Sequence, residues 1–129
     1  MAKAEPRRKA AYRRGIASEY VAALMLLAKG YRILAMRYRS PIGEIDIVAR
    51  RGRHFAFVEV KARHDMESGL AAVSPQAQSR ARRAAQAWLA QEELHGRLPE
   101  DFTATLDLVV TRPWRLPRHF PGAFGHELC

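Results

Sequence analysis

The feature that most constrains the fold of this chain is a pair of opposite charges inside an apolar strand. Residues 55–61 read Phe-Ala-Phe-Val-Glu-Val-Lys, so Glu59 and Lys61 interrupt a run typical of a buried strand. A charge in such surroundings is costly unless it is paired, bound to a metal or used in a reaction. Because the two residues are two apart, they share one face of the strand.

A second strand is predicted directly upstream, over residues 44–49. Period-two alternation sends its apolar residues Ile45, Ile47 and Ala49 to one face and Glu44, Asp46 and Val48 to the other. Residues 50–54, with Gly52, predict a hairpin turn into the strand at 55–62. That hairpin brings Asp46 close to Glu59 and Lys61.

The remaining elements predict a mixed sheet flanked by helices. We expect a helix over 11–29, strands at 31–39, 44–49 and 55–62, a helix from Ser74-Pro75 to about Glu92, and a strand at 105–111. Short turns make the first three strands an antiparallel meander, and the second helix is long enough to cross over to a parallel fourth strand. The predicted fold class is α/β.

Both helices carry stripes that should pack on the sheet. In the first helix the stripe is Ile16, Tyr20, Ala23, Leu24 and Leu27. In the second it is Ala77, Ala81, Ala84, Ala85, Trp88 and Leu89, and we expect Tyr20 and Trp88 in the core. Arg80, Arg82 and Arg83 form a basic flank on the second helix, which either holds phosphate or is simply solvated.

Charge distribution predicts a polyanionic partner. The chain has a net charge of +9, and residues 1–14 hold six Lys or Arg against one acid. We expect a basic flexible arm over 1–14 and a single domain over 15–129, although the arm could equally be a solvated tail. The one cysteine, Cys129, excludes an internal disulfide. We expect a cytoplasmic protein with no membrane span, since the longest apolar stretch is far shorter than a bilayer requires.

Two carboxylates and a lysine on one patch of sheet suit metal-assisted cleavage of a phosphodiester. Mg²⁺, or Mn²⁺ in its place, prefers one or two carboxylates and keeps several waters, and the carbonyl of Val60 could add a ligand to Asp46 and Glu59. Lys61 would orient or deprotonate the attacking water and stabilise charge on the phosphate. We find no ligand spacing for zinc and no glycine-rich phosphate loop.

Some of these residues have an alternative structural interpretation. Glu59 and Lys61 could form a buried ion pair without a reaction. Glu44 could either take part in metal binding or occupy a solvated strand edge, and Asp107 could either brace the site or lie at a strand edge.

Several motifs together resemble a known bacterial family. They are Gly30-Tyr-Arg-Ile-Leu34, Gly43-Glu-Ile-Asp-Ile-Val-Ala49, Phe57-Val-Glu-Val-Lys-Ala-Arg63 and His119-Phe-Pro-Gly-Ala-Phe124. From about residue 15 to 124 the chain resembles the YraN-like uncharacterised protein family 0102, which is similar to the PD-(D/E)XK nucleases with their restriction-endonuclease-like core and to archaeal Holliday-junction resolvases.

The resemblance implies roles for individual residues. Asp46 matches the aspartate of the nuclease motif, Glu59 and Lys61 match its E-x-K, and Glu19 matches an acid on the first helix that approaches the metal. Glu19 also has a second interpretation, as a salt bridge on the helix surface. The second helix lacks the lysine common in the family near Ala77 or Gln78, and Leu106 replaces a common phenylalanine.

The predicted function is therefore a Mg²⁺-dependent endonuclease acting on DNA, with branched structures as the substrate that the resemblance adds. A symmetric homodimer would suit a four-way junction. Two alternatives from other classes are a nucleic-acid-binding module that does not cleave and a protein-interaction adaptor, because a fold does not establish an activity.

Overall fold

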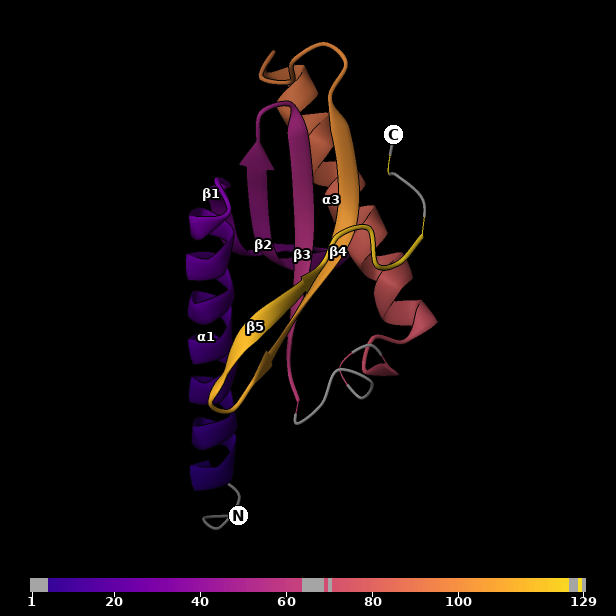
Figure 1. The fold of residues 1–129 in the computed structure, drawn as a ribbon. Coiled ribbons are helices and arrows are strands. Elements are labelled where there is room, and N and C mark those ends of the chain that lie inside the picture. Colours follow the sequence, from indigo (N-terminus) through magenta and orange to yellow (C-terminus); the bar gives the residue numbers. More distant parts are fainter. Residues whose placement is uncertain (1–4, 64–68, 70, 126–127, 129) are drawn as a thin grey trace.

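The computed structural model describes the backbone of residues 5–63, 69, 71–125 and 128, and within those ranges the side chains from residue 15 onward. The elements are α1 (Glu5–Ala28), β1 (Arg32–Ser40), β2 (Gly43–Arg51), β3 (His54–Ala62), α3 (Pro75–Leu94), β4 (Thr103–Arg112) and β5 (Arg115–Phe120) (Figure 1). The predicted order of helix, three strands, helix and strand is confirmed. The predicted arm over 1–14 overlaps α1 from Glu5 onward, its side chains lie outside the described part, and the division into arm and domain stays a prediction.

The strands form one mixed sheet in the order β1-β2-β3-β4-β5. Neighbouring strands are antiparallel except for β3 and β4, which run parallel because α3 carries the chain back between them. The α/β prediction and the crossover to a parallel fourth strand are thus confirmed. Strand β5 was not predicted, because the strand over 105–111 was expected to be the last one and to stop at Pro113. An edge strand tolerates proline because one row of its backbone groups faces no partner.

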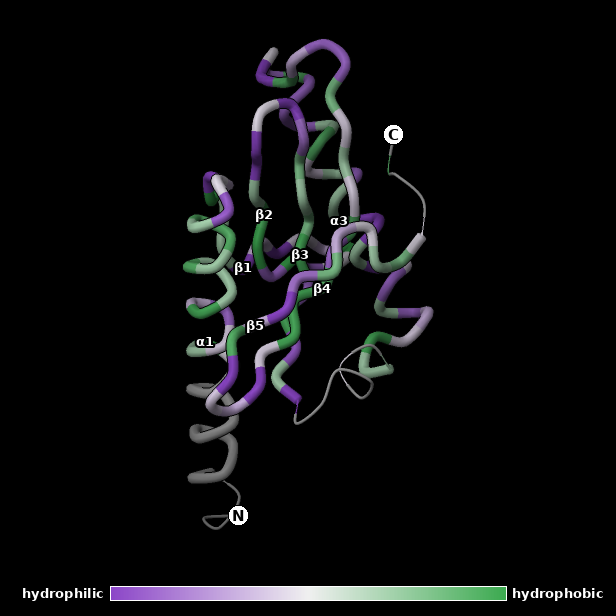
Figure 2. Tube along the Cα trace, viewed as in Figure 1, coloured by the Kyte–Doolittle hydropathy of each residue, from purple (hydrophilic) through white to green (hydrophobic). Residues whose placement is uncertain are grey.

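The two helices cover opposite faces of the sheet (Figure 1). On the α3 side, Phe55, Phe57 and Trp88 pack together, with ring centroids of both phenylalanines 5.7 Å from that of Trp88. On the α1 side, Leu26 and Val58 belong to a second cluster. Figure 2 shows hydrophobic residues concentrated in the middle of the sheet, with hydrophilic residues at the strand ends. The central strands are therefore covered on both faces.

The face through which helix α1 packs overlaps the predicted stripe only in part, at Ala23. Ala22, Ala23 and Leu26 are buried, whereas Tyr20 is 61% exposed, and Leu24 and Leu27 are also exposed. The prediction that Tyr20 lies in the core is wrong. Small alanines let the helix approach the sheet closely, and this turns the bulky apolar residues outward.

Helix α3 follows its sequence signals closely. The hydroxyl of Ser74 accepts a hydrogen bond from the Ala77 amide at 3.1 Å, and proline stands at the first turn. The predicted stripe is buried from Ala81 onward, including Trp88, while Ala77 is exposed. Within the described helices, no segment combines the length and the apolar character that a membrane crossing requires.

Candidate active site

The site forms where β2 and β3 separate. Their antiparallel register runs from Arg51↔His54 to Ile47↔Val58 and ends there. Beyond that point the amide of Val60 donates a 2.8 Å hydrogen bond to Oδ2 of Asp46. A residue bonded across an antiparallel pair directs both its N–H and its C=O to the same neighbour. The carbonyl of Val60 therefore faces the same side as the Asp46 carboxylate.

The separation coincides with a break in the alternation of β2. Arg37 of β1 lies opposite Asp46, between the pairs Met36↔Ile47 and Tyr38↔Ile45, and has a left-handed φ of 55°. Ile45 packs in the cluster on the α3 side and Ile47 in the cluster on the α1 side. The predicted common face for these two isoleucines is wrong, because the strand turns about its axis at Asp46. This turn lets the Asp46 side chain accept the hydrogen bond from the Val60 amide of β3.

Glu59 and Lys61 lie on the face of β3 opposite Val58 and Val60, which pack on the α1 side. Both charged side chains are half-buried. Burial, followed by the nearby Asp46 charge, raises the pKa of Glu59 to about 8, and Lys61 opposes that rise. Burial also raises the pKa of Asp46, against the hydrogen bond from Val60 and the charge of Lys61. Without a cation the two carboxyls resist being ionised together.

Lys61 lies near these two acids without forming an ion pair with either. Among the described residues, no ion pair joins it to Glu59 or to Asp46. Its charge lowers the pKa of both carboxyls, so it lies close enough to act on the same centre. The described residues therefore lack the Glu59–Lys61 ion pair that the structural alternative requires.

Glu19 approaches the same centre from α1. It is 8% exposed, and its Oε2 lies 3.3 Å from Nε of Arg37. Burial raises its pKa first and the charge of Asp46 second, which places the two acids within electrostatic reach. The ion pair is real, as one interpretation proposed, but it spans α1 and β1 beside the site and does not lie on an open helix surface. Sequence reasoning missed Arg37, which no motif marked.

Glu44 has a solvated partner. It is exposed on β2 and faces Arg39 of β1 across the ladder, with Oε2 3.5 Å from Nε of that arginine. An exposed pair of this kind contributes little to stability. The strand-edge interpretation of Glu44 fits this contact.

The residues that converge fit a hard divalent cation. Asp46 and Glu59 offer carboxylate oxygens and Val60 a carbonyl. Burial raises the pKa of both acids, with a smaller contribution from nearby carboxylates, and a bound cation would favour their ionised forms. Across the described part of the chain, no three His, Cys, Asp or Glu side chains converge as a ready metal cage. Two carboxylates with several retained waters suit Mg²⁺ or Mn²⁺ better than zinc.

The three arginines predicted to hold phosphate lie on α3. Arg80 and Arg83 are exposed and Arg82 is half-buried. Among the described side chains, no hydrogen bond or ion pair connects these arginines to Asp46, Glu59 or Lys61. Their role in binding stays a prediction.

Asp107 is fully buried, so it does not occupy a strand edge. Its oxygens accept hydrogen bonds from the hydroxyl of Thr105 at 2.6 Å and the amide of Gly122 at 2.9 Å, and Oδ2 lies 2.7 Å from Nε2 of His119. Nδ1 of His119 lies 2.6 Å from Nζ of Lys29, just beyond α1. The network connects β5 to the sheet. Its signals in the sequence were the acid inside an apolar strand and the motif over residues 119–124, which contains His119 and Gly122.

Comparisons with known proteins place this geometry in context. The model of the uncharacterised protein family UPF0102 matches residues 18–111. A UPF0102 protein of Rhizobium etli strain CIAT 652 is 54% identical over 117 residues, which cover 91% of this chain and 93% of the relative. A UPF0102 protein of Rhodopseudomonas palustris strain BisB18 is 51% identical over 121 residues, covering 94% of this chain and 87% of the relative.

A solved structure shows the fold class. Hjc of Archaeoglobus fulgidus, described as a Holliday junction resolvase from an archaeal hyperthermophile, aligns with a TM-score of 0.50 over 80% of this chain and 72% of its own. The two sequences are 21% identical, so the likeness speaks for the fold alone. The predicted restriction-endonuclease-like α/β core is confirmed.

Proposed function

We propose that this chain, which belongs to the uncharacterised protein family UPF0102, is a metal-dependent nuclease that hydrolyses phosphodiester bonds in DNA. The observation that carries the proposal is the Asp46–Glu59 pair at the point where β2 and β3 separate, with Lys61 beside it. Buried acids with raised pKa values and an adjacent cation are more typical of a reactive site than of a structural one. Hjc of Archaeoglobus fulgidus, which has a similar fold, is described as a Holliday junction resolvase. Branched DNA is therefore the first substrate to test.

Asp46, Glu59 and the carbonyl of Val60 would hold Mg²⁺ or Mn²⁺. The bound ion would supply Lewis-acid polarisation of the phosphate. Lys61 orients the attacking water by a hydrogen bond and stabilises negative charge as it grows on the phosphate oxygens. The amide of Val60 keeps the Asp46 carboxylate aimed at the centre through its 2.8 Å hydrogen bond. Each of these groups lies on a strand of the sheet, and groups placed on strands are held more precisely than groups on loops.

Glu19 is a positioning residue in this mechanism. Its ion pair with Arg37 connects α1 to the point of β1 that lies opposite Asp46. Its negative charge adds to the field that draws a cation to Asp46 and Glu59.

The DNA itself would be bound through cations. The chain carries 22 Lys and Arg against 13 acids, and phosphate contacts of this kind bind a polyanion through counterion release. Arg80, Arg82 and Arg83 of α3 belong to that surface in our proposal. A homodimer would present two such centres to the two strands of a junction.

The test is cleavage by purified protein of four-way junction, flapped and linear DNA in Mg²⁺ or Mn²⁺. Asp46→Asn should abolish cutting and metal binding measured by calorimetry. Asp101→Asn is the matched control, because Asp101 is exposed in a loop and has a left-handed φ of 57° that asparagine also adopts.

The outcomes separate the three classes of function. Metal-dependent cutting that Asp46→Asn removes and Asp101→Asn retains supports the nuclease. Salt-sensitive DNA binding with no turnover, unchanged by Asp46→Asn, refutes it in favour of a binding module. A lack of DNA binding even at low salt refutes it in favour of a protein adaptor.

A further inference from the structure

The tip of the β4–β5 hairpin presents an aromatic side chain to solvent. Pro113 and Trp114 join the two strands, and Trp114 is fully exposed, at 102%. Its φ of 59° lies in the left-handed region, where glycine or asparagine is the usual residue. A bulky aromatic held in that conformation and packed against nothing is an expensive choice for a turn. The stability of the fold therefore gives no reason for a tryptophan at this position.

Two arginines flank this tryptophan and face each other across the hairpin. Arg112 and Arg115 are cross-strand partners, an arrangement in which like charges repel. No ion pair neutralises either side chain within the described residues, and Nε of Arg112 is buried without a hydrogen-bond partner. The stretch 108–126 contains three Arg and two His but no Asp or Glu. A bound anion would neutralise the repulsion between the two guanidinium groups.

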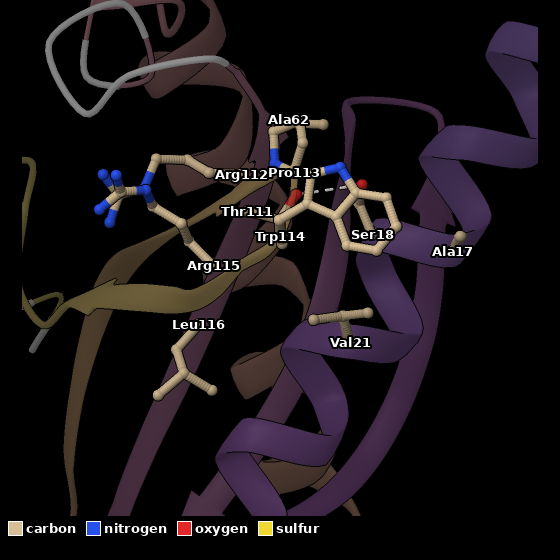
Figure 3. A pocket seen from close by; sticks show the side chains of 10 residues that line it. All are labelled: Ala17, Ser18, Val21, Ala62, Thr111, Arg112, Pro113, Trp114, Arg115 and Leu116. Atoms are coloured by element: carbon tan, nitrogen blue, oxygen red, sulfur yellow. Dashed lines mark hydrogen bonds between the residues drawn. The ribbon is translucent and has the colours of Figure 1, made fainter.

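A pocket of about 630 Å³ lies between this hairpin and α1. Val21 of α1 and Leu116 of β5 form apolar walls, and Thr111 at its base is hydrogen-bonded to Ser18 at 3.1 Å. Figure 3 shows the Trp114 indole turned toward α1, with the guanidinium groups of Arg112 and Arg115 on the other side of the tip. The hairpin tip therefore carries an aromatic face on the side of α1 and a pair of cations on the opposite side.

The pocket lies at the same end of the sheet as the candidate active site. Its lining includes Ala62, which directly follows Lys61 in β3. Ala62 pairs with Thr111 of β4. The pocket lies on the α1 face and Glu59 on the opposite face of β3, so a strand bound in the pocket would cross the carboxyl end of β3 to reach the site.

We infer that the hairpin tip binds an unpaired nucleotide of a nucleic-acid strand: Trp114 stacks on its base, and Arg112 and Arg115 hold its phosphate. The inference rests on the proposed function for the direction of the strand, and it adds that the substrate has an unpaired segment beside the site. A base in a duplex has both faces covered by its neighbours, so an exposed indole can stack fully only on a base that is out of the helix. The cation pair selects a polyanion over a second copy of this basic chain.

The experiment measures binding in EDTA, where no metal-dependent cleavage takes place. A single-stranded oligothymidylate and a blunt duplex are titrated with wild type, Trp114→Ala and Trp114→Phe, and affinity is read by fluorescence anisotropy. Leu94→Ala is the matched control, since Leu94 is an exposed apolar residue at the end of α3. Urea midpoints of all variants check that the fold is unchanged.

Trp114→Ala should weaken oligothymidylate binding about ten-fold or more, with Trp114→Phe retaining most of the affinity and duplex binding changing less than about two-fold. The oligothymidylate should quench the Trp114 fluorescence that wild type has and Trp114→Phe lacks. Replacing both Arg112 and Arg115 with glutamine should lower the salt dependence of single-strand binding by about one phosphate contact.

Unchanged single-strand affinity in Trp114→Ala overturns the inference, and so does an equal loss for the duplex. A dimer that Trp114→Ala dissociates without altering oligonucleotide affinity also overturns it and assigns the tip to a second copy. These results do not depend on cleavage. A protein that never cuts DNA but binds single strands through Trp114 would refute the nuclease proposal and leave this one standing.

Discussion

Replacing Glu59 with glutamine should stabilise the metal-free protein at alkaline pH while abolishing its activity. In the folded chain, burial and the Asp46 charge raise the pKa of Glu59 to about 8 from an ordinary value of 4.5. The folded state therefore holds a proton on Glu59 that the unfolded state releases between these two values. The free energy of unfolding falls as pH rises through that window, and the loss is complete above about pH 8.

The magnitude follows from the size of that pKa difference. Each pKa unit corresponds to about 1.4 kcal/mol, so the rise from 4.5 to about 8 sets a ceiling of about 5 kcal/mol. Asp46 shares the burial and the repulsion, and we therefore expect at least about 2 kcal/mol to be recovered when Glu59 becomes a neutral glutamine of the same shape. Below pH 4.5 the glutamic acid is already neutral and the difference should vanish.

The assay is urea denaturation in EDTA at pH 4, 6.5 and 8.5. Glu93→Gln is the matched control, because Glu93 is an exposed acid on α3. Addition of Mg²⁺ at pH 8.5 should stabilise wild type and not Glu59→Gln, since only the folded wild-type site gains a ligand. If the stability of Glu59→Gln relative to wild type does not grow between pH 4 and 8.5, Glu59 is not a buried acid of raised pKa and the reasoning fails.

Two further predictions concern the scaffold around the site. Asp107→Ala should reduce the free energy of unfolding by about 3 kcal/mol, because it leaves Nε2 of His119 and the Gly122 amide unpaired in a dry interior. Asp107→Asn should lose less, and urea midpoints that fail to separate the two variants would contradict the network. Gly43→Ala should cost about 1–3 kcal/mol, because its added Cβ would lie 2.4 Å from the carbonyl oxygen of Arg80. Gly15→Ala in α1, where a Cβ meets nothing, is the control and should raise the urea midpoint instead.

Local chemistry in the sequence was enough to predict the central part of the fold. Three signals each act over a few residues: the apolar run around Glu59, the turn at Gly52 and the Ser74-Pro75 start of α3. Residues adjacent in the sequence were therefore enough to predict the strand, the hairpin and the helix. The same runs of residues predicted that Asp46, Glu59 and Lys61 would share one patch, because period-two alternation and a short turn leave few other arrangements.

Contacts between distant segments decided the rest. Helix α1 is apolar on more than one side, so its periodicity could not show that Ala22 and Leu26 pack on the sheet while Tyr20 faces solvent. That choice depends on how closely the helix approaches the strands, and it is also what turns Glu19 toward the site.

The separation of β2 from β3 was likewise invisible in the sequence, because it depends on Arg37 of another strand and on where the ladder stops. The sequence determined which acids and which lysine this protein could use. Only the tertiary structure decided that the Asp46 carboxylate would accept a hydrogen bond from the Val60 amide. That contact depends on how β1, β2 and β3 are placed relative to one another.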